Sequence, residues 1–228
     1  MASRSETTSE IEGFSLGRPE LVCRWRLAGR GLPLENRHIR ALAWRTIRGE
    51  RLSPELLAWV KQHIEWTLRD GAFAHPDGVL MLIVDEQGRA AMTVGGYEPL
   101  AATTTSALAQ RALDASVERD RTGIAPETLW LADGDRLIAG LGGGAHSSGA
   151  TALVSQLADT LGIPVAREEG LAARLLSGDA PAHDEVFLVS DEHGVVPARD
   201  GAGHFGRRLA ASYETLLETE RRKRNPQL

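Results

Sequence analysis

The stretch from Gly149 to Ala210 constrains the fold most, because apolar runs and chain breakers alternate there at short intervals. Its pattern predicts a helix, a strand, a second helix, two strands and a closing helix. The run DEVFLVS, which begins at Asp184, is typical of a buried strand, and the residues from Phe205 to Glu218 predict the closing helix. Helices and strands mixed in this order predict an α+β fold.

The first half of the chain predicts a smaller α+β lobe with its own sheet. Its expected elements are a strand within 14–27, a helix over 34–47, a helix capped by Ser53 and Pro54 that runs to Gly71, and a hairpin of strands at 79–84 and 89–94. A helix over 105–121 and a hairpin over 128–139 then lead to the C-terminal stretch. The predicted domains are a disordered tail at 1–12, an N-terminal lobe at 13–100, a C-terminal lobe at 106–218 and a charged tail at 219–228.

Composition limits the classes of partner. The chain has 228 residues, 42% of them hydrophobic, and a net charge of −5, so it can bury a core and has no global field that favours nucleic acid. A single cysteine, Cys23, excludes an internal disulfide, and we expect it in the core. The polar start of the chain lacks the apolar region of a signal peptide, and no apolar run could span a membrane, so we expect a cytoplasmic protein. The large excess of arginine over lysine indicates a bacterial genome rich in G and C.

Four segments resemble one known family. In order and in sequence they are similar to the C-terminal half of the class IV (fold type IV) aminotransferases, which include branched-chain aminotransferases and aminodeoxychorismate lyases. The four segments are LGIPVARE, DEVFLVS, VVPAR and HFGRRLAASYETLL. The resemblance implies a two-lobe architecture, here shortened, and a homodimer. In the N-terminal lobe, LENRHIRAL resembles the helix that carries the family's phosphate-binding arginine.

The resemblance also implies residues that this chain lacks. The family holds pyridoxal phosphate on a lysine, and the matching position falls at Thr104, while the only lysines are Lys61 and Lys223. Ala41 stands at the position of the phosphate arginine, and Arg40 lies one residue early, which turns a helical side chain by about 100°. A Gly-Thr pair of the family is replaced by residues 190–192, two of which are carboxylates. We therefore expect no cofactor, with pyridoxal phosphate as the alternative.

The candidate binding residues surround the glycine-rich loop. Gly149, Ala150 and Thr151 match the family's phosphate-binding helix start, where free N–H groups bind anions, and Ser148, Arg40 and Tyr97 are expected beside them. The alternative is a plain lead-in to a helix with Ser148 as N-cap.

Three residues are candidate catalytic groups: His146, His38 and Thr104. The alternatives are a surface loop for His146, a solvated stripe of His38, Arg40 and Arg45, and an N-cap for Thr104. No spacing of residues resembles a metal motif.

Together these features predict a class IV aminotransferase-like protein without the cofactor lysine. We expect a cofactor-independent enzyme or a ligand-binding protein that takes a small anionic metabolite, with no nucleic-acid or membrane partner. The alternatives are an active pyridoxal-phosphate-dependent aminotransferase or lyase, and a non-catalytic accessory protein.

Overall fold

A computed structural model describes residues 15–224, so the expected tail at 1–12 lies outside the described residues. The first sheet is antiparallel, with strand order β1-β4-β5. Its strands are β1 (Pro19–Arg26), β4 (Val79–Asp85) and β5 (Ala90–Gly95). One face packs on α2 (Pro54–Gly71), whose buried side chains Val60, Ile64 and Leu68 recur at helical spacing. As predicted, Ser53 caps α2 by accepting a hydrogen bond from the Leu56 N–H at 3.2 Å.

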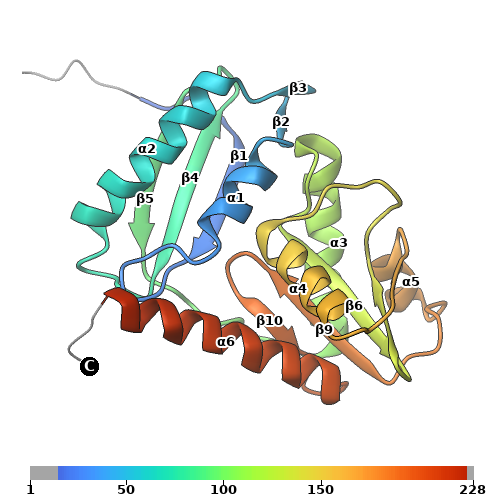
Figure 1. Ribbon diagram of the computed structural model, residues 1–228. Coiled ribbons are helices and arrows are strands. Elements are labelled where there is room, and N and C mark those ends of the chain that lie inside the picture. Colours follow the sequence, from blue (N-terminus) through green and yellow to red (C-terminus); the bar gives the residue numbers. More distant parts are fainter. Residues whose placement is uncertain (1–14, 225–228) are drawn as a thin grey trace, which may run out of the picture.

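The second sheet has five strands in the order β10-β9-β6-β7-β8, and only the β7–β8 pair is parallel. Its strands are β6 (Glu127–Asp133), β7 (Arg136–Ala139), β8 (Val165–Arg167), β9 (Glu185–Ser190) and β10 (Gly194–Pro197). Helices cover both faces (Figure 1). These helices are α3 (Thr105–Thr122), α4 (Gly149–Thr160), α5 (Leu171–Ser177) and α6 (His204–Arg224).

Alternation along β6 divides the second core between two helix layers. Leu129 and Leu131 pack in a cluster with α3 and α5, whereas Trp130 and Ala132 pack in a cluster with α4 and α6. Successive side chains of a strand point to opposite faces, so one apolar run serves both layers. This explains why the centres of β6 and β9, LWLA and VFLV, are continuous apolar runs.

The element order agrees with the sequence-based expectation, and the α+β fold class is confirmed. The first helix differs: α1 (Glu35–Leu42) ends early, and a short hairpin of β2 (Thr46–Ile47) and β3 (Glu50–Arg51) follows. The turn of this hairpin contains Arg48 and Gly49, both at positive φ. Cys23 is buried as predicted, and burial raises its pKa to about 11.

The closing helix also extends further than predicted. α6 continues to Arg224, and in Figure 1 it runs below the second sheet towards the first. Near its end the Arg221 guanidinium bonds Asp77 at 2.7 Å. This contact joins the end of α6 to the loop before β4, 144 positions earlier in the sequence. None of the described helices is long and apolar enough to cross a membrane.

Candidate functional site

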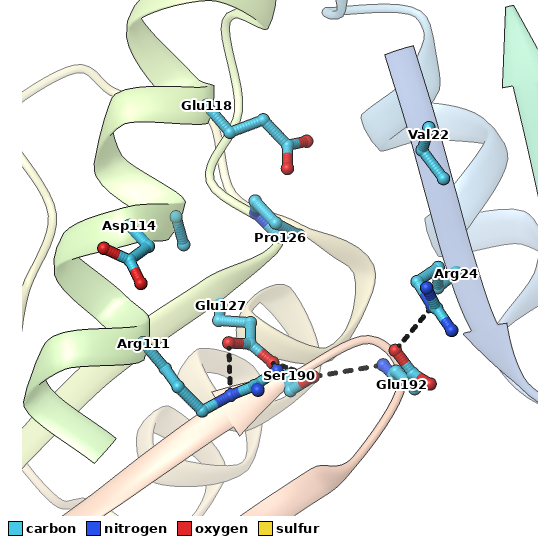
Figure 2. Close-up of a pocket in the computed structure, with 10 residues that line it drawn as sticks. Val22, Arg24, Arg111, Asp114, Glu118, Pro126, Glu127, Ser190 and Glu192 are labelled. Atoms are coloured by element: carbon cyan, nitrogen blue, oxygen red, sulfur yellow. Dashed lines mark hydrogen bonds and ion pairs between the residues drawn. The ribbon is translucent and has the colours of Figure 1, made fainter. Parts of the chain in front are cut away.

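A pocket of about 460 Å³ lies between β1 of the first sheet and α3, which packs on the second sheet (Figure 2). One wall is β1, where alternation turns Val22 and Arg24 to the pocket while Cys23 and Trp25 enter the core. The opposite wall is α3, which presents Arg111, Asp114, Ala115 and Glu118 from one face. The floor is formed by the start of β6 and the end of β9. We call this the interlobe pocket.

Two guanidinium–carboxylate pairs stand in the interlobe pocket. On the α3 side, Arg111 donates to both oxygens of Glu127 at 2.9 and 2.7 Å, and the Ser190 hydroxyl donates to the same carboxylate at 3.1 Å. On the β1 side, Arg24 contacts Glu192 at 2.8 Å. Glu127 is mostly buried and fixed by three bonds, so its partner Arg111 is held in one orientation.

The pocket is more acidic than basic. Four carboxylates line it against two guanidinium groups, and one of the four, Glu118, is also bonded to Arg45 at 2.9 Å. Burial raises the pKa of Glu192, an effect that Arg24 partly offsets. The site therefore offers both a place for a carboxylate, at the guanidinium groups, and a place for a cation, at the carboxylates.

A histidine and a tyrosine adjoin this network. His193 Nε2 lies 3.5 Å from Arg111, and His193 Nδ1 lies 3.4 Å from the Tyr97 hydroxyl. The Arg26 guanidinium lies over the Tyr97 ring, 3.2 Å from its centre. Burial, with the positive charges of Arg111, Arg26 and Arg24, lowers the pKa of His193 to about 4. The imidazole is therefore neutral at pH 7 and can accept a hydrogen bond.

This lowered pKa predicts a pH dependence of stability. Between about pH 6.5, the ordinary histidine pKa, and about pH 4, the unfolded chain binds a proton at His193 that the folded chain does not bind. The free energy of unfolding should therefore fall as the pH is lowered through this range. His193→Gln should flatten that part of a urea-denaturation pH profile, while His183→Gln, at an exposed histidine, should not. A profile unchanged by His193→Gln would contradict the assignment.

The helix start expected to bind an anion is already occupied by the chain's own carboxylate. Asp191 Oδ1 accepts a hydrogen bond from the Ala150 N–H at 2.7 Å, and both residues are buried. Ser148 caps the next free group, the Thr151 N–H, at 3.4 Å. Burial acts to raise the pKa of Asp191, but His38 and the Ala150 N–H outweigh it, and the pKa is lowered. A negative charge is thus stabilised here, and Asp191 supplies it.

His38 completes this buried junction. Its Nδ1 lies 3.5 Å from Asp191, its ring stacks on Trp25 at 5.2 Å, and only 3% of the residue is exposed. A Cβ added at Gly149 would lie 2.5 Å from the same nitrogen. Glycine at this position is therefore required by the close approach of the His38 ring.

The structure distributes the predicted site residues over four places. Gly149, Ala150, Thr151, Ser148 and His38 share the buried junction with Asp191. Arg40 and His146 line a small surface pocket instead, and Tyr97 lies beside His193. Thr104 caps α3 by accepting from the Ala107 N–H at 3.3 Å, as its alternative predicted.

One of the alternatives is wrong. His38 and Arg45 do not belong to a solvated stripe, because both are buried.

Five residues of the interlobe pocket and its surroundings were not among the candidates predicted from the sequence: Arg24, Arg111, Glu127, Glu192 and His193. A signal existed for Glu127, an acidic residue at the start of a strand whose centre is apolar. Among the described residues, no group of three or more His, Cys, Asp or Glu side chains is placed to hold a metal ion.

No protein-family model matches the chain, and no curated protein matches it by sequence. Solved structures do match. A Thermotoga maritima protein assigned as a branched-chain amino acid aminotransferase superposes with a TM-score of 0.54 at 14% identity, over 87% of this chain and 86% of that one. The chain has the fold of the class IV aminotransferases. A Legionella pneumophila protein assigned as a 4-amino-4-deoxychorismate lyase gives 0.52 at 10% identity, over 92% and 97%.

The comparisons correct the expectation about cofactors. An aminotransferase from Brucella abortus bound to pyridoxal phosphate matches with a TM-score of 0.53 at 13% identity, over 91% of this chain and 95% of that one. A hypothetical aminotransferase from Mycobacterium tuberculosis has likewise been solved with pyridoxal phosphate. The expectation of no cofactor is therefore contradicted, because solved structures with the same fold contain pyridoxal phosphate.

The residues of this chain fit that cofactor poorly at the position that the family resemblance indicated. The Ala150 N–H is bonded to Asp191, and no lysine lines the interlobe pocket. Lys61 is exposed on α2, and Lys223 lies 3.5 Å from Glu220 on α6. Any cofactor would need other contacts than those of a helix-bound phosphate and a pocket lysine.

Proposed function

We propose that this fold type IV protein binds a small metabolite carrying both a carboxylate and an ammonium group, as an amino acid does, in the interlobe pocket. The supporting observation is the pair of guanidinium–carboxylate contacts, Arg111–Glu127 and Arg24–Glu192, within one cavity of about 460 Å³. Cavities of this size hold small ligands oriented by a few polar groups. A purely anionic metabolite, which the sequence suggested, would meet an excess of carboxylates.

Each charged group of the ligand has a partner. A carboxylate would bind Arg111 or Arg24, since a guanidinium group matches two oxygens at once. An ammonium group would bind Glu192 or Asp114, which line the same pocket. The neutral imidazole of His193 lies beside Arg111 and would accept a hydrogen bond from the ammonium group of a ligand held there.

A matched ligand panel tests this proposal. We expect at least one protein amino acid to raise the melting temperature, while its amine (no carboxylate) and its 2-hydroxy acid (no ammonium) bind at least about tenfold more weakly. Arg111→Ala should weaken amino-acid binding by a similar factor, and Arg69→Ala, whose partner Asp70 lies on α2 outside the pocket, should not. Equal binding of all three analogues would contradict the proposal.

A second candidate is a pyridoxal-phosphate-dependent aminotransferase or lyase, which the cofactor-bound structures of the same fold favour. Incubation with pyridoxal phosphate, borohydride reduction and mass spectrometry test it. A covalent adduct that disappears in Lys61→Ala would support this candidate. A protein whose mass stays unchanged after reduction would contradict lysine-bound cofactor chemistry.

A further inference from the structure

A second polar pocket, of about 170 Å³, lies on the surface where α1 meets α4, and it shares no lining residue with the interlobe pocket. Arg37, Arg40 and Trp44 reach it from α1 and the turn that follows. His146 and Ser147 of the glycine-rich loop form the other side. The pocket thus brings together the two sequence candidates, Arg40 and His146, that the interlobe pocket does not use.

The charge of this surface pocket is uncompensated. None of its lining residues is acidic. Within residues 15–224, the Arg40 side chain forms no hydrogen bond or ion pair, and the only side-chain bond of Arg37 is to the neutral amide of Gln156. Two guanidinium groups without a carboxylate partner in one hollow create a local positive potential. The rest of the protein is acidic, since the whole chain carries a net charge of −5.

The surface pocket is also held in shape by contacts around it. The His146 ring stacks on Trp44 with centroids 3.6 Å apart and planes at 19°, and the Arg51 guanidinium lies 4.1 Å from the centre of the Trp44 ring. Arg167 donates to the Ala145 carbonyl and the Ser147 hydroxyl, each at 3.2 Å. The Ser147 oxygen accepts that bond, so its own hydrogen remains available to a ligand.

We propose that this surface pocket binds a phosphate group, either inorganic phosphate or a small phosphate monoester. Two guanidinium groups, a hydroxyl and an imidazole provide more donors than the two oxygens of a carboxylate can use, and they suit the several oxygens of a phosphate. The N–H groups of α4 take no part, since Asp191 and Ser148 already accept from them. Side chains alone therefore make this site, which is independent of the interlobe pocket.

Calorimetric titration of the full chain with inorganic phosphate at low ionic strength tests the proposal, with acetate as the matched carboxylate probe. We expect phosphate to bind more tightly than acetate, and its dissociation constant to rise at least about tenfold in Arg40→Ala and in Arg37→Ala. Arg40 is exposed, so Arg40→Ala should keep the melting temperature of the wild type. Arg40→Gln provides a second variant that keeps the length of the side chain.

Arg69→Ala serves as the control, because it removes the same charge at an exposed residue of α2 and should leave phosphate binding unchanged. Absence of phosphate binding in the wild type would overturn the proposal. So would equal weakening by Arg40→Ala and Arg69→Ala, because that result would indicate general electrostatics instead of a site. Either outcome would leave amino-acid binding in the interlobe pocket intact, so the two proposals fail separately.

Discussion

Asp191→Ala should lower the free energy of unfolding by about 3 kcal/mol, the order expected when one partner of a buried charged contact is removed. The substitution removes the oxygen that accepts from the Ala150 N–H at 2.7 Å. It also removes the carboxylate oxygen that lies 3.5 Å from His38 Nδ1. Both groups are buried, so water cannot replace the carboxylate without opening the junction. Urea denaturation at neutral pH measures the loss.

Asp200→Ala is the matched control for this prediction. Asp200 accepts from the Thr105 N–H at the start of α3, also at 2.7 Å, but this bond is exposed. Loss of an exposed helix cap costs about 1 kcal/mol. Equal losses in the two variants would show that the burial of Asp191 contributes nothing, and this would contradict its role as the anion of the α4 helix start.

Gly149→Ala should also destabilise the protein, by about 1–3 kcal/mol, the range for overpacking a core. The new Cβ would lie 2.5 Å from Nδ1 and 2.9 Å from Cε1 of His38, and stacking on Trp25 limits the movement of that ring. Helix propensity alone predicts the opposite sign, because alanine is favoured over glycine in a helix by about 1 kcal/mol. The sign of the change therefore separates the two effects.

Two further variants make the test of Gly149 sharper. Gly143→Ala, in the same glycine-rich loop, adds a Cβ with nothing within 4 Å and should be nearly neutral. Combining Gly149→Ala with His38→Ala should cost less than the sum of the two single losses, because the clash needs both side chains. Strict additivity in this cycle would argue against the contact.

The sequence predicts the order of elements well because hydrophobic periodicity is local. It fails where a contact joins distant segments. The carboxylates at 191 and 192 are visible in the sequence, yet nothing local indicates that Asp191 accepts a hydrogen bond from the Ala150 N–H, 41 positions earlier. The early end of α1 depends on the β2–β3 hairpin, whose turn contains two residues at positive φ, Arg48 and Gly49.

The interlobe pocket was missed for the same reason. Arg24, Arg111, Glu127 and Glu192 lie on four different segments, and nothing within any one segment indicates that the four meet. The sequence pattern places Arg24 and Arg111 at solvent-facing positions of a strand and a helix. Only the packing of the two sheets brings them to one cavity. In contrast, the alternative interpretation of Thr104 as a helix cap is confirmed, and it was accessible from the sequence because capping depends on neighbours in sequence.

The most direct test of the interlobe pocket is a set of ¹H–¹⁵N correlation spectra of the protein titrated with the protein amino acids. We predict that at least one amino acid shifts the amide signals of residues that line the pocket, among them Arg24, Arg111, Glu127 and Glu192, and that Arg111→Ala removes these shifts. Spectra that no amino acid changes, or shifts confined to residues outside this pocket, would contradict the account.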